Sequence, residues 1–305
     1  MDAKQPHSAE QFGPQRDFWW NRDFLELMAR RWRLAEATSL ADIGCGRCHW
    51  SRLLYPYLRQ PARLAAIDRE DRWVAEGEQH FRRDFRDVAS ELLTFRQGLA
   101  TAIPLPDDSF EVVTCQTVLM HLPNPMKALR EMLRVLRPGG LLICVEPNNF
   151  WNYIPFSSMT SADPTEKLAQ QFEFWLRCHR GRIALEEGDH AIGDLLPGYF
   201  AQLGLADIFV CQSDRAASLY PPYDNPAQQA MIEDEQRAKD LASGPWNRAE
   251  VLRLYVAGGG TEEILKRVFE ELTQDYEREQ AAIGAKTFHA GRGSIQYLVS
   301  GRKHE

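Results

Sequence analysis

The sequence predicts an α/β fold with a doubly wound, mostly parallel sheet, and two observations lead to this prediction. Short apolar stretches with the composition of buried strands recur through the first half of the chain. Segments with the apolar spacing of helices lie between these stretches. Alternation of this kind is typical of a parallel sheet that is covered by helices on both faces.

The first predicted strand, residues 39–43, leads into a loop that contains Gly44 and Gly46, after which the apolar spacing becomes helical. Because glycine has no Cβ, the backbone can turn sharply there and a ligand can approach closely. A helix N-terminus adds unpaired N–H groups. The G-x-G-x-x-G fingerprint of dinucleotide sites is only half met, since its sixth position is His49. Asp42, just before the first glycine, favours a ligand that carries an ammonium group.

The second predicted strand, Arg63 to Asp68, ends in a carboxylate 22 residues after Gly46. That spacing is close to the offset of roughly 20 residues at which an acidic side chain meets a ribose diol in doubly wound folds. A helix from Pro125 to Leu136 and a break at Arg137–Gly140 are expected before the fifth strand. The remaining predicted strands are Leu92–Arg96, Phe110–Gln116 and Leu141–Val145, followed by weaker ones at Leu205–Gln212 and Ser294–Ser300.

Taken together, residues Leu40 to Glu146 resemble the class I S-adenosylmethionine-dependent methyltransferases, in the branch that contains many small-molecule methyltransferases. The resemblance implies a Rossmann-like seven-stranded sheet, mostly parallel with an antiparallel last strand, and helical cap insertions. It also implies transfer of a methyl group from S-adenosylmethionine to an O, N or C nucleophile of a small molecule by in-line displacement. The sequence does not identify the acceptor or the methylated atom.

The resemblance further implies which residues bind the cofactor. The family usually has a glycine where Cys48 stands and an aspartate where Leu99 stands, so the contacts to the adenine amino group are expected to differ here. The resemblance implies Asp42, Gly44 and Gly46 at the methionine end, Asp68 at the ribose hydroxyls, Leu99 and Ala100 at the adenine, and Gln116 close to the methionine moiety. Four further residues are expected to bind the cofactor: Cys45, Arg69, Thr117 and Trp20.

Several side chains near this site have two interpretations. Trp19 and Trp20 either cover the cofactor or belong to the core. His121 either accepts a proton from the acceptor or caps a short helix, and it is the candidate catalytic residue. Glu146 either orients an acceptor hydroxyl or amine, or caps a loop. The Cys45-x-x-Cys48 pair suggests metal or redox chemistry, but no second pair follows it, and no metal is expected.

Composition narrows the function classes. The formal net charge of −7 and the lack of a dense basic cluster disfavour nucleic acid as a partner. The sequence contains no run of 18 apolar residues, so no membrane-spanning helix is predicted. The polar segment Met1–Pro14 is expected to be an arm rather than a secretory signal. Reduced thiols in a cytoplasmic protein explain the six cysteines. The oligomeric state, a homodimer included, stays open.

We expect the 305 residues to form one core with insertions. Aromatic residues in the insertions favour an apolar or aromatic acceptor beneath a helical cap. The expected parts are an N-terminal arm and covering helix (1–38), the cofactor-binding core (39–147), a helical cap insertion (148–190), a core helix and strand (191–212), a helical insertion on the substrate side (213–292) and the last core strand (293–305).

Three other functions remain open at this stage. A protein or tRNA methyltransferase would share the cofactor site but need a peptide-sized or basic groove. A non-catalytic S-adenosylmethionine-binding protein would keep the site without acceptor chemistry. A nicotinamide oxidoreductase is the most distant alternative, because the glycine fingerprint is incomplete.

Overall fold

The computed structural model describes residues 16, 18–150, 156–243, 246–292 and 295–305. The expected arm, 1–14, therefore lies outside the described residues, as does the middle of the loop that follows the fifth strand. The chain divides into two compact units, each of which is described by itself. The sheet unit comprises Trp20–Asn148, Ala191–Asp214 and Gln296–Glu305, and the helical unit comprises Met1–Trp19, Asn149–His190 and Arg215–Ile295.

The sheet unit contains a seven-stranded sheet in the order β3-β2-β1-β4-β5-β9-β6. The pairs among β1 to β5 are parallel, and β6 pairs with β9 in antiparallel fashion. The predicted seven-stranded, mostly parallel sheet with an antiparallel last strand is thus confirmed. The strands are β1 (Ser39–Ile43), β2 (Arg63–Asp68), β3 (Leu93–Gln97), β4 (Phe110–Gln116), β5 (Leu136–Asn148), β6 (Ala206–Gln212) and β9 (Ile295–Arg302).

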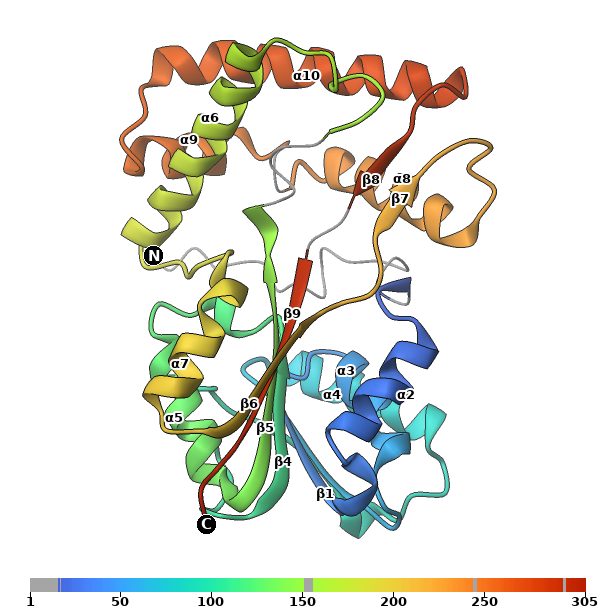
Figure 1. Cartoon of the computed structure of the whole chain (residues 1–305), viewed down its shortest axis with the longest axis vertical. Coiled ribbons are helices and arrows are strands. Elements are labelled where there is room, and N and C mark those ends of the chain that lie inside the picture. The colour runs from blue at the N-terminus through green and yellow to red at the C-terminus, as the bar shows by residue number, and fades with distance from the viewer. Residues whose placement is uncertain (1–15, 17, 151–155, 244–245, 293–294) are drawn as a thin grey trace. The chain divides into compact units, whose positions relative to one another are not determined.

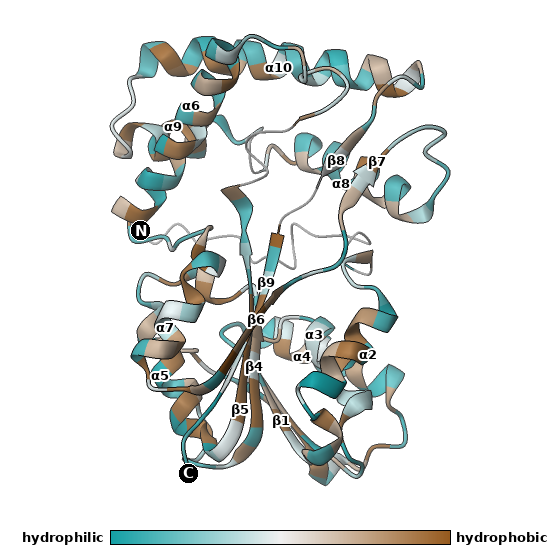
Figure 2. Cartoon of the chain, in the orientation of Figure 1, coloured by the Kyte–Doolittle hydropathy of each residue, from teal (hydrophilic) through white to brown (hydrophobic). Residues whose placement is uncertain are grey.

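Helices cover both faces of this sheet, as Figure 1 shows. On one face lie α2 (Arg22–Arg31), α3 (His49–Leu54) and α4 (Asp71–Asp84), and on the other lie α5 (Pro125–Val135) and α7 (Leu196–Gln202). The central strands β1, β4 and β5 are predominantly hydrophobic in Figure 2, as expected of strands that are buried on both sides. Short 3₁₀ helices complete the unit: η2 (Leu34–Glu36), η3 (Tyr55–Tyr57), η4 (Ser90–Leu92), η5 (Leu119–His121) and η7 (Ile192–Asp194).

Two sequence-based boundaries were wrong. The expected break at Arg137–Gly140 is part of β5, because Gly139 donates its N–H to the Lys303 carbonyl and Lys303 donates to the Gly140 carbonyl, each at 3.0 Å. The single core helix expected within residues 191–212 is two short elements, η7 and α7, and Pro197 stands at the start of the second.

Within its described residues, the helical unit contains four helices of ten or more residues. It also contains a two-stranded sheet, which was not predicted from the sequence. Helices α6 and α9 cross closely: a Cβ on Gly181 would lie 1.7 Å from the Leu254 carbonyl oxygen, and one on Gly258 would lie 1.9 Å from that of Arg177. Hydrophobic and polar residues alternate along α10 in Figure 2. The elements are α6 (Thr165–Ala184), β7 (Ala217–Leu219), α8 (Pro226–Asp240), α9 (Arg248–Ala257), α10 (Glu262–Gly284) and β8 (Ala290–Arg292).

Among the described residues, the search for membrane-crossing helices finds none of sufficient length and apolar character.

Candidate cofactor and methyl-transfer site

The glycine loop after β1 lies at the carboxyl edge of the sheet. Gly44 and Gly46 have φ values of +74° and +49°, which glycine adopts without steric cost. The N–H groups of Gly44 and Cys45 both donate to the Ile67 carbonyl on β2, at 2.7 and 3.0 Å. A Cβ on Gly44 would lie 2.4 Å from Cγ2 of Val118, so the loop passes directly against the segment that follows β4.

Two buried carboxylates flank this loop. Asp42, at 1% exposure, accepts a hydrogen bond from the Ser51 N–H in the first turn of α3 at 3.2 Å. Asp68, at 2% exposure, accepts from the Gly46 N–H at 2.9 Å and from the Glu70 N–H at 3.1 Å. Because β1 and β2 are parallel neighbours, both acids reach the same edge. Two neighbouring carboxylates at this edge of the sheet suit a ligand that carries hydroxyl and ammonium groups.

The segment after β3 presents an apolar surface beside Asp68. The Gly98 N–H donates to the Asp68 carbonyl at 2.8 Å, which places the next residues at this edge. Leu99 is 55% exposed and forms an isolated bridge with Ala102, whereas Ala100 packs against the core of the sheet unit. An exposed leucine at this edge offers apolar contact to a planar ring, and the adenine contact expected of Leu99 and Ala100 stays a prediction.

The end of β4 carries a polar side chain without a partner. Gln116 is 4% exposed, and neither its amide nitrogen nor its amide oxygen has a hydrogen-bond partner within the described part of the chain. Thr117, the next residue, has a φ of +53°, which is unusual for a β-branched residue, and its N–H donates to the Val145 carbonyl at 2.8 Å. Unsatisfied buried amides and strained backbone gather at binding sites.

Trp20 takes part in an aromatic cluster with side chains of α2 and α3. Its ring centroid lies 5.1 Å from that of Trp50 and 6.3 Å from that of Phe24. Its buried indole nitrogen has no hydrogen-bond partner in the regions that the structure describes. Trp50 in turn donates to the Thr114 hydroxyl on β4 at 2.8 Å. Trp20 is therefore packed in the core, and its free indole N–H remains available to a ligand.

His121 and Glu146, which each have two interpretations, differ in their surroundings. His121 is half-buried at the end of η5, where its backbone N–H donates to the Val118 carbonyl at 3.1 Å. The carboxylate of Glu146 is fully buried and accepts the N–H groups of Val118, Leu119 and Met120. Of the two interpretations of Glu146, loop capping is the one that its contacts bear out.

Cys45 and Cys48 are free, buried thiols. A hydrogen bond with Cys48, together with burial, raises the pKa of the Cys45 thiol well above its ordinary value, so this thiol is protonated and unreactive at neutral pH. Cys48 has a φ of +56°, which is the conformation that the glycine of related proteins adopts easily. Its sulfur faces Gly77 of α4 rather than the ligand side of the loop, because a Cβ on Gly77 would lie 2.9 Å from it.

One acid–base pair in the helical unit was not singled out from the sequence. His179 on α6 faces Asp189, with Nε2 3.5 Å from Oδ1, and its Nδ1 has no hydrogen-bond partner among the described atoms. Burial lowers the pKa of His179, while Asp189 opposes that shift. The signal that could have found the pair is weak, since ten residues separate the two side chains in the sequence.

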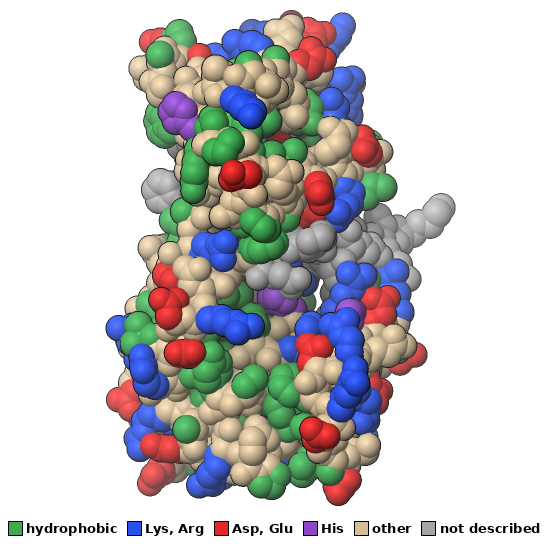
Figure 3. All heavy atoms as spheres, turned by 90° about the vertical axis from the view of Figure 1, so that its right-hand side faces the viewer, with side chains coloured by type: hydrophobic (Ala, Val, Ile, Leu, Met, Phe, Trp, Pro, Cys, Tyr) green, Lys and Arg blue, Asp and Glu red, His purple; other side chains and the backbone are tan. Residues whose placement is uncertain are grey.

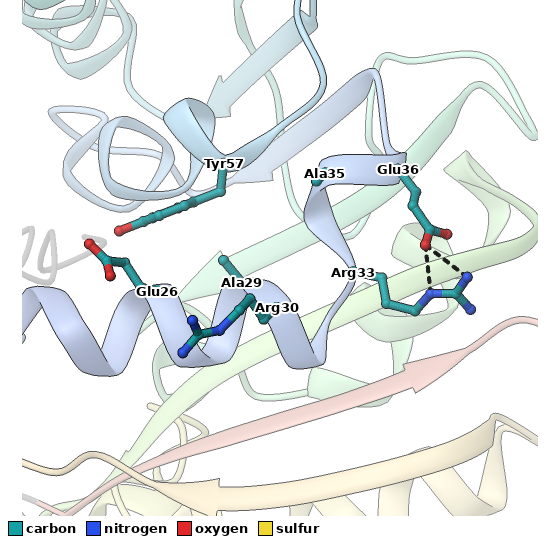
Figure 4. Close-up of a pocket in the computed structure, with 7 residues that line it drawn as sticks. All are labelled: Glu26, Ala29, Arg30, Arg33, Ala35, Glu36 and Tyr57. Carbon is teal, nitrogen blue, oxygen red and sulfur yellow. Dashed lines mark hydrogen bonds and ion pairs between the residues drawn. The ribbon is translucent and has the colours of Figure 1, made fainter.

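A pocket of about 440 Å³ elsewhere in the sheet unit contains none of the predicted cofactor residues. Figure 4 shows that α2, η2 and η3 supply its lining and that Arg33 pairs with Glu36 across its rim. Because η2 precedes β1, this pocket belongs to the amino-end side of that strand. It is lined by Glu26, Ala29, Arg30, Arg33, Ala35, Glu36 and Tyr57.

Charges of both signs are interspersed on the face shown in Figure 3. Several of the arginines near the glycine loop are paired, such as Arg47 with Glu76 at 2.9 Å and Arg52 with Asp84. Among the described residues, no group of three or more His, Cys, Asp or Glu side chains has the arrangement of a metal site. On the face shown in Figure 3, the mixture of acidic and basic side chains differs from the continuous basic face of a protein that binds nucleic acid.

The site therefore fits the cofactor that its residues suggest. An unpartnered buried amide at Gln116, the glycine loop and the carboxylates of Asp42 and Asp68 lie at one edge of the sheet. Ligands of open α/β sheets bind at this edge. An adenosine carrying a cationic amino-acid tail matches these groups in charge and in hydrogen bonding.

Comparison with known proteins agrees with this assignment. Residues 41–144 match the family model described as a methyltransferase domain. Over residues 41–144 the chain is thus similar to methyltransferase domains, which agrees with the family resemblance of the sequence and with S-adenosylmethionine as the expected cofactor.

The most similar relatives considered are demethylmenaquinone methyltransferases. That of Listeria welshimeri is 31% identical over 128 residues, which is 42% of this chain and 50% of the relative. That of Halalkalibacterium halodurans is 29% identical over 132 residues, which is 43% of this chain and 51% of the relative. The chain thus spans about half the length of these curated relatives.

Solved structures share the fold at low sequence identity. A candidate methyltransferase of Bacillus halodurans C-125 superposes with a TM-score of 0.50 at 15% identity, covering 93% of this chain and all of the other. The [4+2]-cyclase SpnF superposes with a TM-score of 0.50 at 17% identity, covering 93% of this chain and 80% of the other. A protein named as a cyclase has this fold too, so the fold alone does not specify the reaction.

Proposed function

We propose that this protein transfers a methyl group from S-adenosylmethionine to a small-molecule acceptor. The observation that carries the proposal is the buried Gln116 amide without a partner, at the strand end that faces the glycine loop. A buried amide that lacks partners costs free energy of about 1–3 kcal/mol, and a bound ligand removes that cost. The relatives' names support a small-molecule acceptor.

In this proposal, each residue has a role toward the cofactor or the acceptor that agrees with its place at the sheet edge. Asp68 binds the ribose hydroxyls, Asp42 and the Gly44–Gly46 backbone hold the amino-acid tail, and Leu99 packs on the adenine. When bound, the cofactor supplies a methyl group on a sulfonium and leaves as a neutral thioether. Gln116 and Thr117 fix the donor end, and His121 accepts the proton of a hydroxyl acceptor. The chain's main contribution is alignment of nucleophile and methyl group.

The test begins with binding. We expect S-adenosylhomocysteine to bind the wild-type protein in isothermal titration calorimetry, and Asp68→Ala to weaken that binding by about 1–3 kcal/mol. The exposed acid Asp87 provides a control, and Asp87→Ala should bind as the wild type does. No heat of binding with the wild-type protein would contradict the proposal.

The second step finds the acceptor. The protein is incubated with a metabolite extract and S-adenosylmethionine that carries a deuterated methyl group. A deuterated methyl group on a small metabolite, seen by mass spectrometry and absent with Asp68→Ala, supports the proposal. A label found only on protein or RNA would replace the small-molecule acceptor with a macromolecule. Binding without any transfer would favour the non-catalytic alternative.

A further inference from the structure

Glu146 holds three consecutive backbone amides with one carboxylate. Its Oε1 accepts the N–H groups of Val118 and Leu119, each at 2.8 Å, and its Oε2 accepts that of Met120 at 3.1 Å. The side chain is fully buried at the carboxyl end of β5. The Sγ of Cys115 on β4 lies 3.7 Å from the same Oε1 and donates to it. All four partners are donors, so the arrangement favours an ionised carboxylate.

The segment held in this way is part of the cofactor site. It begins at the unpartnered Gln116 amide, passes through the strained Thr117 and ends at His121. Val118 also presses on the glycine loop at Gly44. Moving this turn would therefore move the donor-side amide, the candidate base and the loop that holds the amino-acid tail.

The ionisation of Glu146 is balanced near neutral pH. Burial raises the pKa of its carboxyl to about 7, although the bonds from Leu119, Val118 and Met120 act in the opposite direction. The elements packed against β5 carry titratable groups, which are Glu111 and Cys115 on β4, His121 on η5, Lys127, Arg130, Glu131 and Arg134 on α5, Asp194 on η7, and Tyr297 and Arg302 on β9, beside Arg137 and Cys144 on β5 itself. Burial raises the pKa of the Cys115 thiol well above its ordinary value, so this neighbour stays a donor across the neutral range.

We propose that Glu146 is a positioning residue of the cofactor site: its ionised carboxylate sets the turn from Gln116 to His121, and protonating that carboxylate releases the turn and weakens cofactor binding. The inference rests on the cofactor-binding part of the proposed function and not on methyl transfer. It assigns Glu146 no contact with the reacting atoms. Its effect reaches the ligand through the turn.

The main experiment measures S-adenosylhomocysteine binding by calorimetry between about pH 6 and pH 8. We expect the wild-type dissociation constant to rise about tenfold as the pH falls through this range. Glu146→Gln should bind weakly at all of these pH values, because its amide N–H₂ faces the Met120 N–H and cannot accept from it. A flat wild-type profile, or a pH dependence that persists in Glu146→Gln, would overturn the proposal.

Two matched variants isolate the cause. Glu111 lies at the opposite end of β4, where its carboxylate accepts the Thr38 N–H and hydroxyl and pairs with Arg137. Glu111→Gln makes the same chemical change away from the site and should keep the wild-type pH profile. In His121→Gln, loss of the pH dependence would assign the titration to the histidine and refute the role of Glu146.

Hydrogen exchange of the ligand-free protein gives an independent readout. We expect the amides of Val118, Leu119 and Met120 to lose protection at pH 6 relative to pH 8 in the wild type, after correction for the intrinsic pH dependence of exchange. This comparison needs no variant, so it stands if Glu146→Gln does not fold. If the wild type binds no cofactor, the proposed function fails, and the exchange data alone decide: protection that does not change with pH overturns the role of Glu146.

Discussion

Gly77 on α4 is the most sensitive test of how the glycine loop is supported. A Cβ placed on Gly77 would lie 2.7 Å from the Gly46 carbonyl oxygen and 2.9 Å from the Cys48 sulfur. The first of these is a backbone atom and cannot rotate away. Gly198 on α7 is the matched control, since it also lies in a helix but is exposed, and a Cβ there would have no neighbour within 4 Å.

The two substitutions are expected to change the free energy of unfolding in opposite directions. Alanine is better than glycine in a helix by about 0.5–1 kcal/mol, so Gly198→Ala should stabilise the protein by that amount. Overpacking costs about 1–3 kcal/mol, which leaves Gly77→Ala destabilised by up to about 2 kcal/mol. The displaced Gly46 also donates to Asp68 at 2.9 Å, so binding of S-adenosylhomocysteine should weaken several-fold in Gly77→Ala only.

Urea denaturation measures the free energy of unfolding of both variants, and calorimetry measures their cofactor affinity. A Gly77→Ala protein that gains stability as Gly198→Ala does, and binds with wild-type affinity, would refute the close contact between α4 and the loop.

Three further predictions concern stability. Gly44→Ala should cost about 2–4 kcal/mol, from its positive φ and its overlap with Val118, and adding Val118→Ala should recover about 1 kcal/mol in a double-mutant cycle of urea titrations. Thr114→Val should cost about 1–3 kcal/mol, because it leaves the buried Trp50 indole N–H unsatisfied; an unchanged denaturation midpoint would disprove that bond. The pKa of His179 is lowered in the folded state, so protonation favours unfolding and stability falls as the pH drops below about 6.5. His179→Gln should reduce that acid loss in a pH series of melting temperatures, and an identical pH dependence would contradict it.

The cofactor half of the fold was predictable because its constraints are local. Strands buried on both faces, such as β1 and β4, have nearly continuous apolar sequences, and the loop between β1 and α3 has glycine at two of its positive-φ positions. By contrast, β7 and β8 have three residues each, which is too short for alternation to appear in the sequence. The Pro-Gly-Gly segment of β5 resembles a break because its partner, Lys303, lies far along the chain.

The structure brings several of the expected site residues to one sheet edge, and their roles toward a cofactor stay predictions. Positions 42, 44, 46 and 68 follow from the family resemblance, and they meet at one sheet edge. The role of Glu146 stayed open because its hydrogen-bond donors precede it by 26 to 28 residues. Nothing in a helical glycine indicates what it faces, so the contact of Gly77 with the loop could not be predicted.

The place of β9 in the sheet has a consequence for synthesis. In space β9 stands between β5 and β6, but in the chain it follows both. Until the ribosome has released residues 295–302, one edge of β5 has no strand beside it and β6 has no partner to pair with. Because β5 is complete at residue 148 and β6 at residue 212, both strands have open edges until β9 is made, and open edges of this kind can pair with strands of other chains.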